Sequence, residues 1–212
     1  MLGHWKWYGG NICLKMVLKK RSFAVCGHFR MKMVVSVTGR KVFQSNWMYN
    51  PSVELAACLI AWSPNGSAEA ELGWVSLEQG IHYAVQVAAM DQHEVRNFRN
   101  CLTILRPYED IFNFKMNDSL NQVEKKIRQL TADCIDQDVP NWGSGYKALP
   151  LDLIKYPSDV LYQTFKTFVE QNLKFYVDQM SEEGIWDISW SWDQYPDEFS
   201  IARRYWQGIL AV

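Results

Sequence analysis

The chain has 212 residues, of which 48% are apolar and 21% charged, so it is long enough for one domain with a sizeable core. Aromatic residues make up 14% and include ten tryptophans, which indicates a core or a groove lined by flat rings. The five cysteines and four histidines are scattered without the spacing of metal ligands. This pattern argues against a disulfide scaffold or a zinc site, and predicts a cytoplasmic protein with no metal and no other cofactor.

Charge divides the chain into two parts. Residues 1–53 hold nine of the 22 Lys and Arg and none of the 23 Asp and Glu. We therefore expect a basic N-terminal segment over residues 1–45 and a helical domain over residues 46–212. The stretch from Ser22 is rich in Val, Phe and Thr and contains turn signals, so it predicts two or three short strands.

The basic segment has three interpretations. It is an arm for nucleic acid or for a membrane surface, because unpaired positive charge attracts polyanions. Alternatively, it is a poorly formed extension, or it is not the native start of the domain. A nucleic-acid partner is the less favoured interpretation. No apolar run approaches the roughly 18 residues of a membrane span, so no such span is expected.

From Asn50 onward the sequence predicts helices together with the residues at which they begin and end. Asn50-Pro51 supplies an N-cap and a first-turn proline, and the helix stops before Ser63-Pro64. A second helix starts after Ser67. The residues expected to face inward in the two helices are Val53, Ala56, Ala57 and Ile60, then Leu72, Val75, Leu77, Ile81, Val85 and Val87.

Two capping boxes open the next helices. In each, a side chain at the N-cap and another three residues later satisfy free backbone amides. Asp91 with Glu94 precedes a helix with an apolar face, and Ser119 with Gln122 precedes another. The inward residues are Val95, Phe98, Leu102 and Leu105 in the first, and Val123, Ile127 and Leu130 in the second.

The last third of the chain predicts a loop, a helix, a Trp-rich loop and a final helix. Residues 135–157 contain prolines and glycines and form a long ordered loop, a kind that tends to be functional. Ser158-Asp159 caps a long helix that ends near Met180. Its inward residues are Val160, Leu161, Phe165, Phe168, Val169, Leu173, Tyr176 and Val177. The final helix begins at Pro196, and its inward residues are Phe199, Ala202, Tyr205, Trp206 and Ile209. The series predicts an all-α fold of antiparallel helical hairpins.

A family resemblance rests on three segments. FYVDQMSEEGIWDISW, residues 175–190, resembles the glutamine-tryptophan motif of terpenoid cyclases and related α/α toroids through Gln179, Gly184 and Trp186. The tail from Trp190 resembles bacterial squalene-cyclase-like toroid proteins, with Arg204, Trp206 and Gly208 as the matching positions. NPSVELAACLIAW, residues 50–62, resembles an earlier hairpin of the same proteins. The resemblance implies part of an α/α toroid, because a complete one has more helices than are predicted here. We expect either a fragment or a homo-oligomer, since an array that cannot close leaves apolar faces uncovered.

The motifs of the family's enzymes are missing. An Asp-x-Asp-Asp acid, an Asp-Asp-x-x-Asp magnesium motif and a zinc set of prenyltransferase type cannot be matched onto the sequence. A terpenoid cyclase or prenyltransferase is therefore the least favoured function. The leading hypothesis is a non-enzymatic binding protein with an isoprenoid or carbohydrate ligand in a groove within residues 182–208. Its candidate ligand-binding residues are Trp186, Trp190, Trp192, Asp193, Tyr195, Glu198, Arg204 and Trp206.

A carbohydrate-active enzyme is the alternative. A glycoside hydrolase needs two carboxylates, for which Asp193 and Glu198 are the candidates. Lyases of toroid form use Tyr, His and Arg, but His93 is expected on a helix far from the Trp-rich loop in sequence. Purely structural roles are an alternative to both the binding and the enzymatic hypothesis. The tryptophans would plug the end of a helical barrel, and Asp193 or Asp197 would cap the last helix. Arg203 and Arg204 would pair with Glu198 along that helix.

Overall fold

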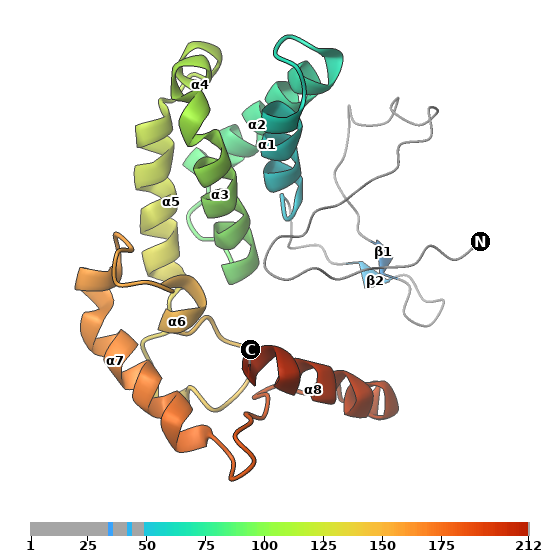
Figure 1. Ribbon diagram of the computed structural model, residues 1–212, viewed down its shortest axis with the longest axis vertical. Coiled ribbons are helices and arrows are strands. Elements are labelled where there is room, and N and C mark those ends of the chain that lie inside the picture. The colour runs from blue at the N-terminus through green and yellow to red at the C-terminus, as the bar shows by residue number, and fades with distance from the viewer. Residues whose placement is uncertain (1–33, 36–41, 44–48, 212) are drawn as a thin grey trace.

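The computed structural model describes residues 34–35, 42–43 and 49–211 (Figure 1). Two short strands, β1 (Val34–Val35) and β2 (Val42–Phe43), pair antiparallel with Val34 opposite Phe43. They agree with the short strands predicted for the basic segment. The other residues before Tyr49 lie outside the described ones, so the interpretations of that segment stay predictions.

From residue 49 to residue 211 the chain is helical, which confirms the all-α prediction for this part. The helices are α1 (Ser52–Trp62), α2 (Ala68–Gln86), α3 (Gln92–Leu105), α4 (Glu109–Lys115), α5 (Leu120–Cys134), α6 (Pro150–Leu153), α7 (Tyr162–Gln179) and α8 (Pro196–Ala211), with 3-10 turns at Arg106–Tyr108 and Val139–Asn141. Helices α4 and α6 were not predicted from the sequence. α4 has seven residues and α6 has four, which is too short for an apolar period to be detected.

Helices α1, α2, α3 and α5 form a bundle around one core. α1 packs on α2 and α3, and α5 packs on α3 and α2. Side chains such as Leu77, Phe98 and Ile127 are at most 1% exposed. Removing this apolar surface from water is the main stabilising contribution, about 25 cal/mol per Å².

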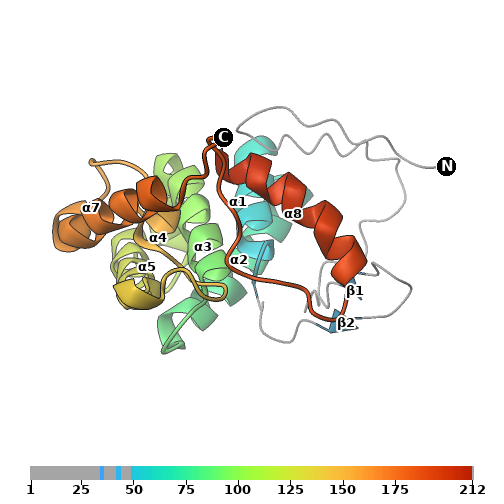
Figure 2. The same ribbon diagram turned by 90° about the horizontal axis from the view of Figure 1, so that it is seen from below.

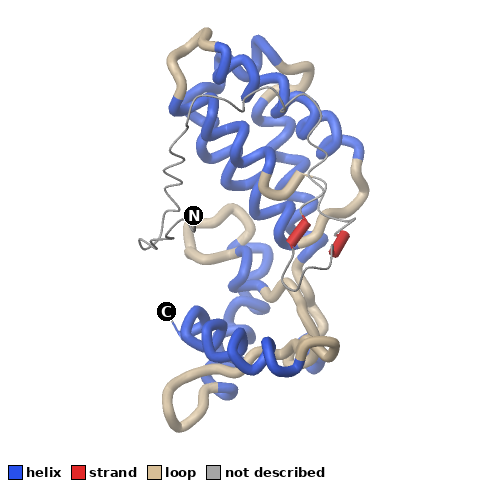
Figure 3. The backbone as a smooth tube through the Cα atoms, turned by 90° about the vertical axis from the view of Figure 1, so that its right-hand side faces the viewer, coloured by secondary structure: helices blue, strands red, loops and turns tan. Residues whose placement is uncertain are grey.

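Helices α7 and α8 lie at one end of this bundle (Figure 1, Figure 3). α7 packs against α6, whereas α8 makes no comparable contact with another described helix. Figure 2 shows the extended segment that joins α7 to α8. α8 is therefore attached through this segment rather than through helix packing.

The predicted caps of α1 and α3 differ in the structure. α1 begins at Ser52 without a side-chain cap, and the side-chain oxygen Oδ1 of Asn50 instead accepts a hydrogen bond from Asn97 Nδ2 at 2.5 Å. At the start of α3, the Asp91 carboxylate does accept from the His93 and Glu94 amides. Glu94 does not return the bond that a capping box requires.

The carboxylate of Glu94 is used between helices. It accepts from the Tyr83 hydroxyl at 3.2 Å and from the Tyr49 amide at 3.4 Å, and the residue is 3% exposed. Burial, more than the Asp91 charge, raises the pKa of Glu94, while burial and the Glu94 charge raise the pKa of Tyr83 to about 12. The contacts of Glu94 with Tyr83 and Tyr49 thus replace the local capping bond that the sequence predicted.

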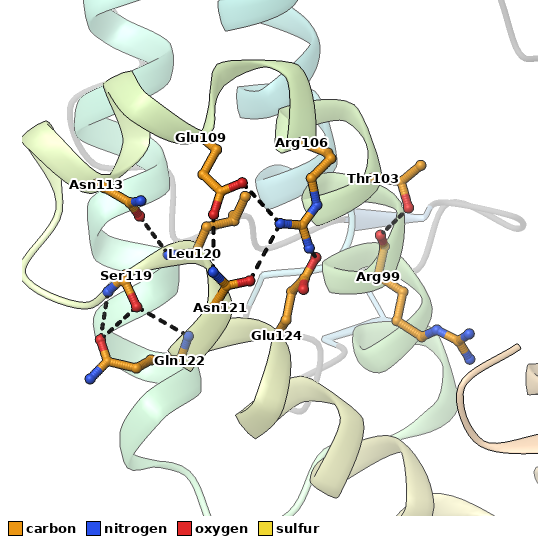
Figure 4. A network of polar contacts seen from close by, with 10 residues as sticks. All are labelled: Arg99, Thr103, Arg106, Glu109, Asn113, Ser119, Leu120, Asn121, Gln122 and Glu124. Carbon is orange, nitrogen blue, oxygen red and sulfur yellow. Dashed lines mark hydrogen bonds and ion pairs between the residues drawn. The ribbon is translucent and has the colours of Figure 1, made fainter.

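Two caps agree with the predicted helix starts, whereas the predicted Ser158-Asp159 cap does not form, because α7 begins after Leu161 without a side-chain cap bond. The Ser67 hydroxyl accepts from the Ala70 amide, and Ser119 with Gln122 forms a complete capping box. Around this box a polar network joins α4 to α5 (Figure 4): Arg106 donates to Glu109 at 3.2 Å and also pairs with Glu124. The network holds the two helices at the turn that precedes α5.

Several residues predicted to face inward are exposed. On α2 the buried stripe runs through Trp74, Leu77 and Ile81, so Val75 lies on the opposite side with 53% exposed. α7 begins at Tyr162, one turn later than its predicted cap, and its outer face has no covering helix among the described residues. The side chains left exposed on α7, on the turn before it and on α8 are Val160, Leu173, Val177, Tyr205, Trp206 and Ile209. Over the part of the chain that is described, none of the helices combines the length and apolarity that crossing a membrane requires.

Candidate functional site

One pocket brings together five separate parts of the chain. It has a volume of about 420 Å³, which lies within the range of small-molecule sites, about 300–1,000 Å³. The contributing parts are the start of α3, the loop before α6 together with α6 itself, the end of α7, the Trp-rich segment and α8. Their lining residues include Gln92, His93, Arg96, Trp142, Tyr146, Lys147, Asp152, Tyr176, Trp186, Asp187, Trp190 and Trp206.

A turn at the end of α7 positions Trp186. Gly184 has φ +73°, a left-handed conformation that favours glycine, and the chain reverses there. The Trp186 indole N–H then donates to Tyr176 O at 2.6 Å, and its ring meets the Tyr176 ring edge-on at 6.4 Å. The ring therefore covers the end of the preceding helix, α7.

Trp190 is the centre of an aromatic cluster. Its ring lies 5.7 to 6.1 Å from those of Tyr146, Trp192, Phe199 and Trp206. Trp190 and Trp192 lie on one side of the extended segment, as their spacing predicts. Phe199 and Trp206 come from α8, so this cluster is the apolar part of its attachment.

The loop before α6 brings a tyrosine to this cluster and to α3. Tyr146 Oη and His93 Nε2 are 2.8 Å apart, and the two rings stack at 5.7 Å. The Gly145 amide donates to Ser189 O and the Ser189 hydroxyl donates back to Gly145 O, which ties this loop to the Trp-rich segment. Beneath it, Trp142 is 1% exposed and anchors the loop through its indole N–H to Asp136 O.

Burial favours the neutral forms of the imidazole and phenol groups of the pocket. It lowers the pKa of His93, and it raises the pKa of Tyr146 and that of Tyr176, the latter to about 12. At neutral pH, therefore, His93 is an uncharged imidazole beside an uncharged phenol. Such a pair can exchange a proton or hydrogen-bond a ligand hydroxyl.

Two of the four charged residues in the lining are paired with residues outside it. Asp187 forms a two-bond contact with Arg203 of α8, through Nε at 2.7 Å and through Nη2, and these hydrogen bonds hold the pKa of Asp187 below its usual value. Lys147 lies 3.5 Å from Asp136. The contact between Asp187 and Arg203 corrects the expectation that Arg203 pairs with Glu198 along the last helix.

The remaining two charges are Arg96 and Asp152. Arg96 Nη2 donates to the backbone carbonyl of Asp152 at 3.1 Å. Asp152 Oδ2 accepts from the Leu149 amide at 2.9 Å, and burial raises the pKa of this carboxyl. No carboxylate of the described residues lies within 4.0 Å of the Arg96 guanidinium nitrogens, and the same holds for Asp152 and any described cation.

Only some of the candidate ligand-binding residues predicted from sequence line the pocket. Trp186, Trp190 and Trp206 line the pocket. Trp192 supports Trp190 and Phe199 from outside it. The remaining candidates, Asp193, Tyr195, Glu198 and Arg204, do not line it.

Asp193 neither caps α8 nor faces the pocket. Its carboxylate accepts from the Ser191 hydroxyl, and the first backbone bond of α8 runs from the Phe199 amide to Tyr195 O. The hydrolase hypothesis named Asp193 together with Glu198, and its proposed pair is thus absent from the lining.

His93, Arg96, Trp142 and Tyr146 were missed as site residues. The available signal was the ordered loop over residues 135–157, whose length predicted a functional role without identifying its partner. The distance in sequence between His93 and the Trp-rich loop does not separate them in space, because Tyr146 contacts both His93 and Trp190.

Within the described residues no group of three or more His, Cys, Asp and Glu side chains could hold a metal ion. Comparison of the chain with protein-family models, with curated proteins and with solved structures gave no match.

Proposed function

We propose that this protein binds a carbohydrate in the pocket between α3, α7 and the Trp-rich segment. The observation that carries the proposal is the combination of aromatic rings, Tyr146, Trp186, Trp190 and Trp206, with polar groups in one pocket of about 420 Å³. Sugar rings present an apolar face to aromatic side chains and hydroxyls to polar groups, so they match both parts of this lining.

An isoprenoid matches the lining less well. Filling the pocket with hydrocarbon would remove Gln92, Arg96 and Asp152 from water without giving them hydrogen-bond partners. An unpaired polar group that is buried costs about 1–3 kcal/mol, and more when it is charged. Hydroxyl groups of a sugar avoid this cost because each one can donate and accept.

The binding test uses intrinsic tryptophan fluorescence and calorimetry of the full chain. Neutral, acidic and amino monosaccharides and short oligosaccharides are titrated in parallel with farnesol. Saturable binding of a sugar supports the proposal, whereas binding of farnesol alone contradicts it. Trp206→Ala should weaken sugar binding about tenfold or more, equivalent to about 1.4 kcal/mol.

Trp62→Ala is the matched control. Trp62 lies at the end of α1 with its side chain 68% exposed and does not line the pocket. Equal affinities for the wild type and this variant are expected. An equal loss in Trp62→Ala and Trp206→Ala would mean that the effect is not local to the pocket.

A carbohydrate-active enzyme at the same pocket is the second candidate function. The observation that favours it is the contact of 2.8 Å between His93 Nε2 and Tyr146 Oη, because a neutral imidazole can take or return the phenol proton during general acid–base catalysis. The test is the release of new reducing ends from a panel of oligosaccharides. Activity that disappears in both His93→Ala and Tyr146→Phe but persists in Asp193→Asn supports this assignment.

We also propose that the helices belong to an α/α toroid. The glycine turn after α7 and the tryptophan that closes it support the proposal, together with the exposed apolar residues of α7 and α8, which a closed array would cover. The oligomeric state measured by light scattering tests whether copies of the chain cover these faces. A monomer at all concentrations would remove self-association as the means of covering them.

A further inference from the structure

The charged side chains of the pocket lining add up to no net charge once their ion pairs are counted. Asp187 is neutralised by Arg203 and Lys147 by Asp136. His93, Tyr146 and Tyr176 are uncharged at neutral pH, because burial disfavours their charged forms. One positive and one negative group are left, Arg96 and Asp152, so a ligand enters a site with no net charge.

Arg96 has donors to spare. A guanidinium carries five N–H groups, and among the described residues only its Nη2 has an acceptor, the carbonyl of Asp152. Its Nε is buried and has no hydrogen-bond partner within the described part of the chain. By contrast, Arg99, Arg106 and Arg203 each pair with a carboxylate.

Asp152 has acceptor capacity to spare. Its Oδ2 accepts from the Leu149 amide, and no described side chain donates to its Oδ1. The carboxylate is held in place by the short helix α6 and by Asn172, whose side-chain carbonyl accepts from the adjacent Leu151 amide at 2.9 Å. Donor and acceptor are therefore fixed on two elements, α3 and α6, on the wall of one pocket.

We infer that the pocket selects an uncharged sugar residue, with hydroxyl groups accepting from Arg96 and donating to Asp152. This inference rests on the proposed carbohydrate binding. A hydroxyl can serve either partner without altering the net charge, and two hydroxyls on one ring can serve both. The rings of Tyr146 and Trp206 then contact the apolar face of the same sugar.

Charged relatives of the same sugar are disfavoured at this site. A uronate would satisfy Arg96 but leave the Asp152 carboxylate beside a second negative charge. A protonated amino sugar would satisfy Asp152 and leave Arg96 beside a second positive charge. Two like charges that lie side by side in a partly buried site repel more strongly than in water, because the surroundings screen them less.

The experiment measures the affinities of three matched sets by calorimetry, at a pH where the amines are protonated. The sets are glucose with glucuronate and glucosamine, galactose with galacturonate and galactosamine, and mannose with mannuronate and mannosamine. In the wild type, the neutral member of the binding set should bind about tenfold more tightly than either charged member.

Two variants test the pairings separately. Asp152→Asn keeps an acceptor for the Leu149 amide but removes the charge, so it should shift preference toward the uronate by about tenfold. Arg96→Gln removes the positive charge and should shift preference toward the amino sugar. Each variant is checked for an unchanged far-UV spectrum, and either one that folds is sufficient for the test.

The outcomes separate this inference from the proposed function. Binding of a charged member as tightly as its neutral relative, or an equal loss for all three members in both variants, overturns the inference and leaves carbohydrate binding intact. Failure of all sugars to bind the wild type, oligosaccharides included, overturns carbohydrate binding and the inference with it.

Discussion

Replacing Gly73 by alanine probes the closest approach in the bundle. A Cβ added at Gly73 would lie 2.8 Å from the backbone oxygen of Ala56 and 2.8 Å from Ile60 Cγ1. Ala56 and Ile60 are both buried in α1, so neither can move aside without displacing that helix. We expect Gly73→Ala to destabilise the protein by forcing α1 and α2 apart.

The magnitude follows from two opposing effects. Overpacking of a well-packed core costs about 1–3 kcal/mol, and contact with backbone places this case in the upper half of the range. Alanine is favoured over glycine within a helix by about 1 kcal/mol. The net loss in the free energy of unfolding should therefore be about 1–2 kcal/mol. For a chain of this size that lowers the melting temperature by about 2–8 °C.

The assay is thermal and urea unfolding of the wild type, Gly73→Ala and Gly208→Ala followed by circular dichroism. Gly208 lies in α8, where an added Cβ meets nothing within 4 Å. This control should keep or slightly raise stability through helix propensity alone. Equal or greater stability of Gly73→Ala relative to the wild type would refute the close packing of α1 on α2.

Three further predictions concern Asp187, Glu94 and Cys101. Asp187→Asn should loosen α8 and shift tryptophan emission to the red. Because its hydrogen bonds to Arg203 lower the pKa of Asp187, the wild-type contact is complete above the ordinary pKa of a carboxyl and is lost as the pH falls through the lowered value. Acidification should therefore reproduce the shift, and a spectrum that is constant in acid would contradict this assignment. Glu94→Ala should cost about 1–3 kcal/mol in urea unfolding, since Tyr83 and the Tyr49 amide lose a buried acceptor; a cost near zero would contradict the bridging role. Cys101 is fully buried and burial raises its pKa, so a thiol reagent should modify it only on unfolding, and labelling of the folded protein at this position would contradict the core assignment.

The helical core could be predicted because it depends on local patterns. Residues such as Val95, Phe98 and Leu102 recur at three- and four-residue spacing, and the structure buries all three. Ser67 and Ser119 precede such runs, and each caps the helix that follows it. A cap and an apolar stripe lie within one or two turns of helix, so short-range order in the sequence is sufficient to identify them.

The errors occurred where a distant segment competed with a local partner. Glu94 and Arg203 each had a local contact available, and each binds another element instead. The exposed positions on α7 and α8 were misassigned for a related reason. An apolar stripe predicts that a face can be buried, while the presence of a covering helix depends on the arrangement of the whole array.

Sequence by itself determined the type and order of the long helices, and it predicted the Trp-rich segment as the place where a ligand binds. Only the tertiary structure decided which residues share that place. Arg96 on α3, Tyr146 in the loop before α6 and Trp206 on α8 are far apart along the chain and lie around one pocket. Such a pocket forms where separate elements converge, and no local pattern records which elements will meet.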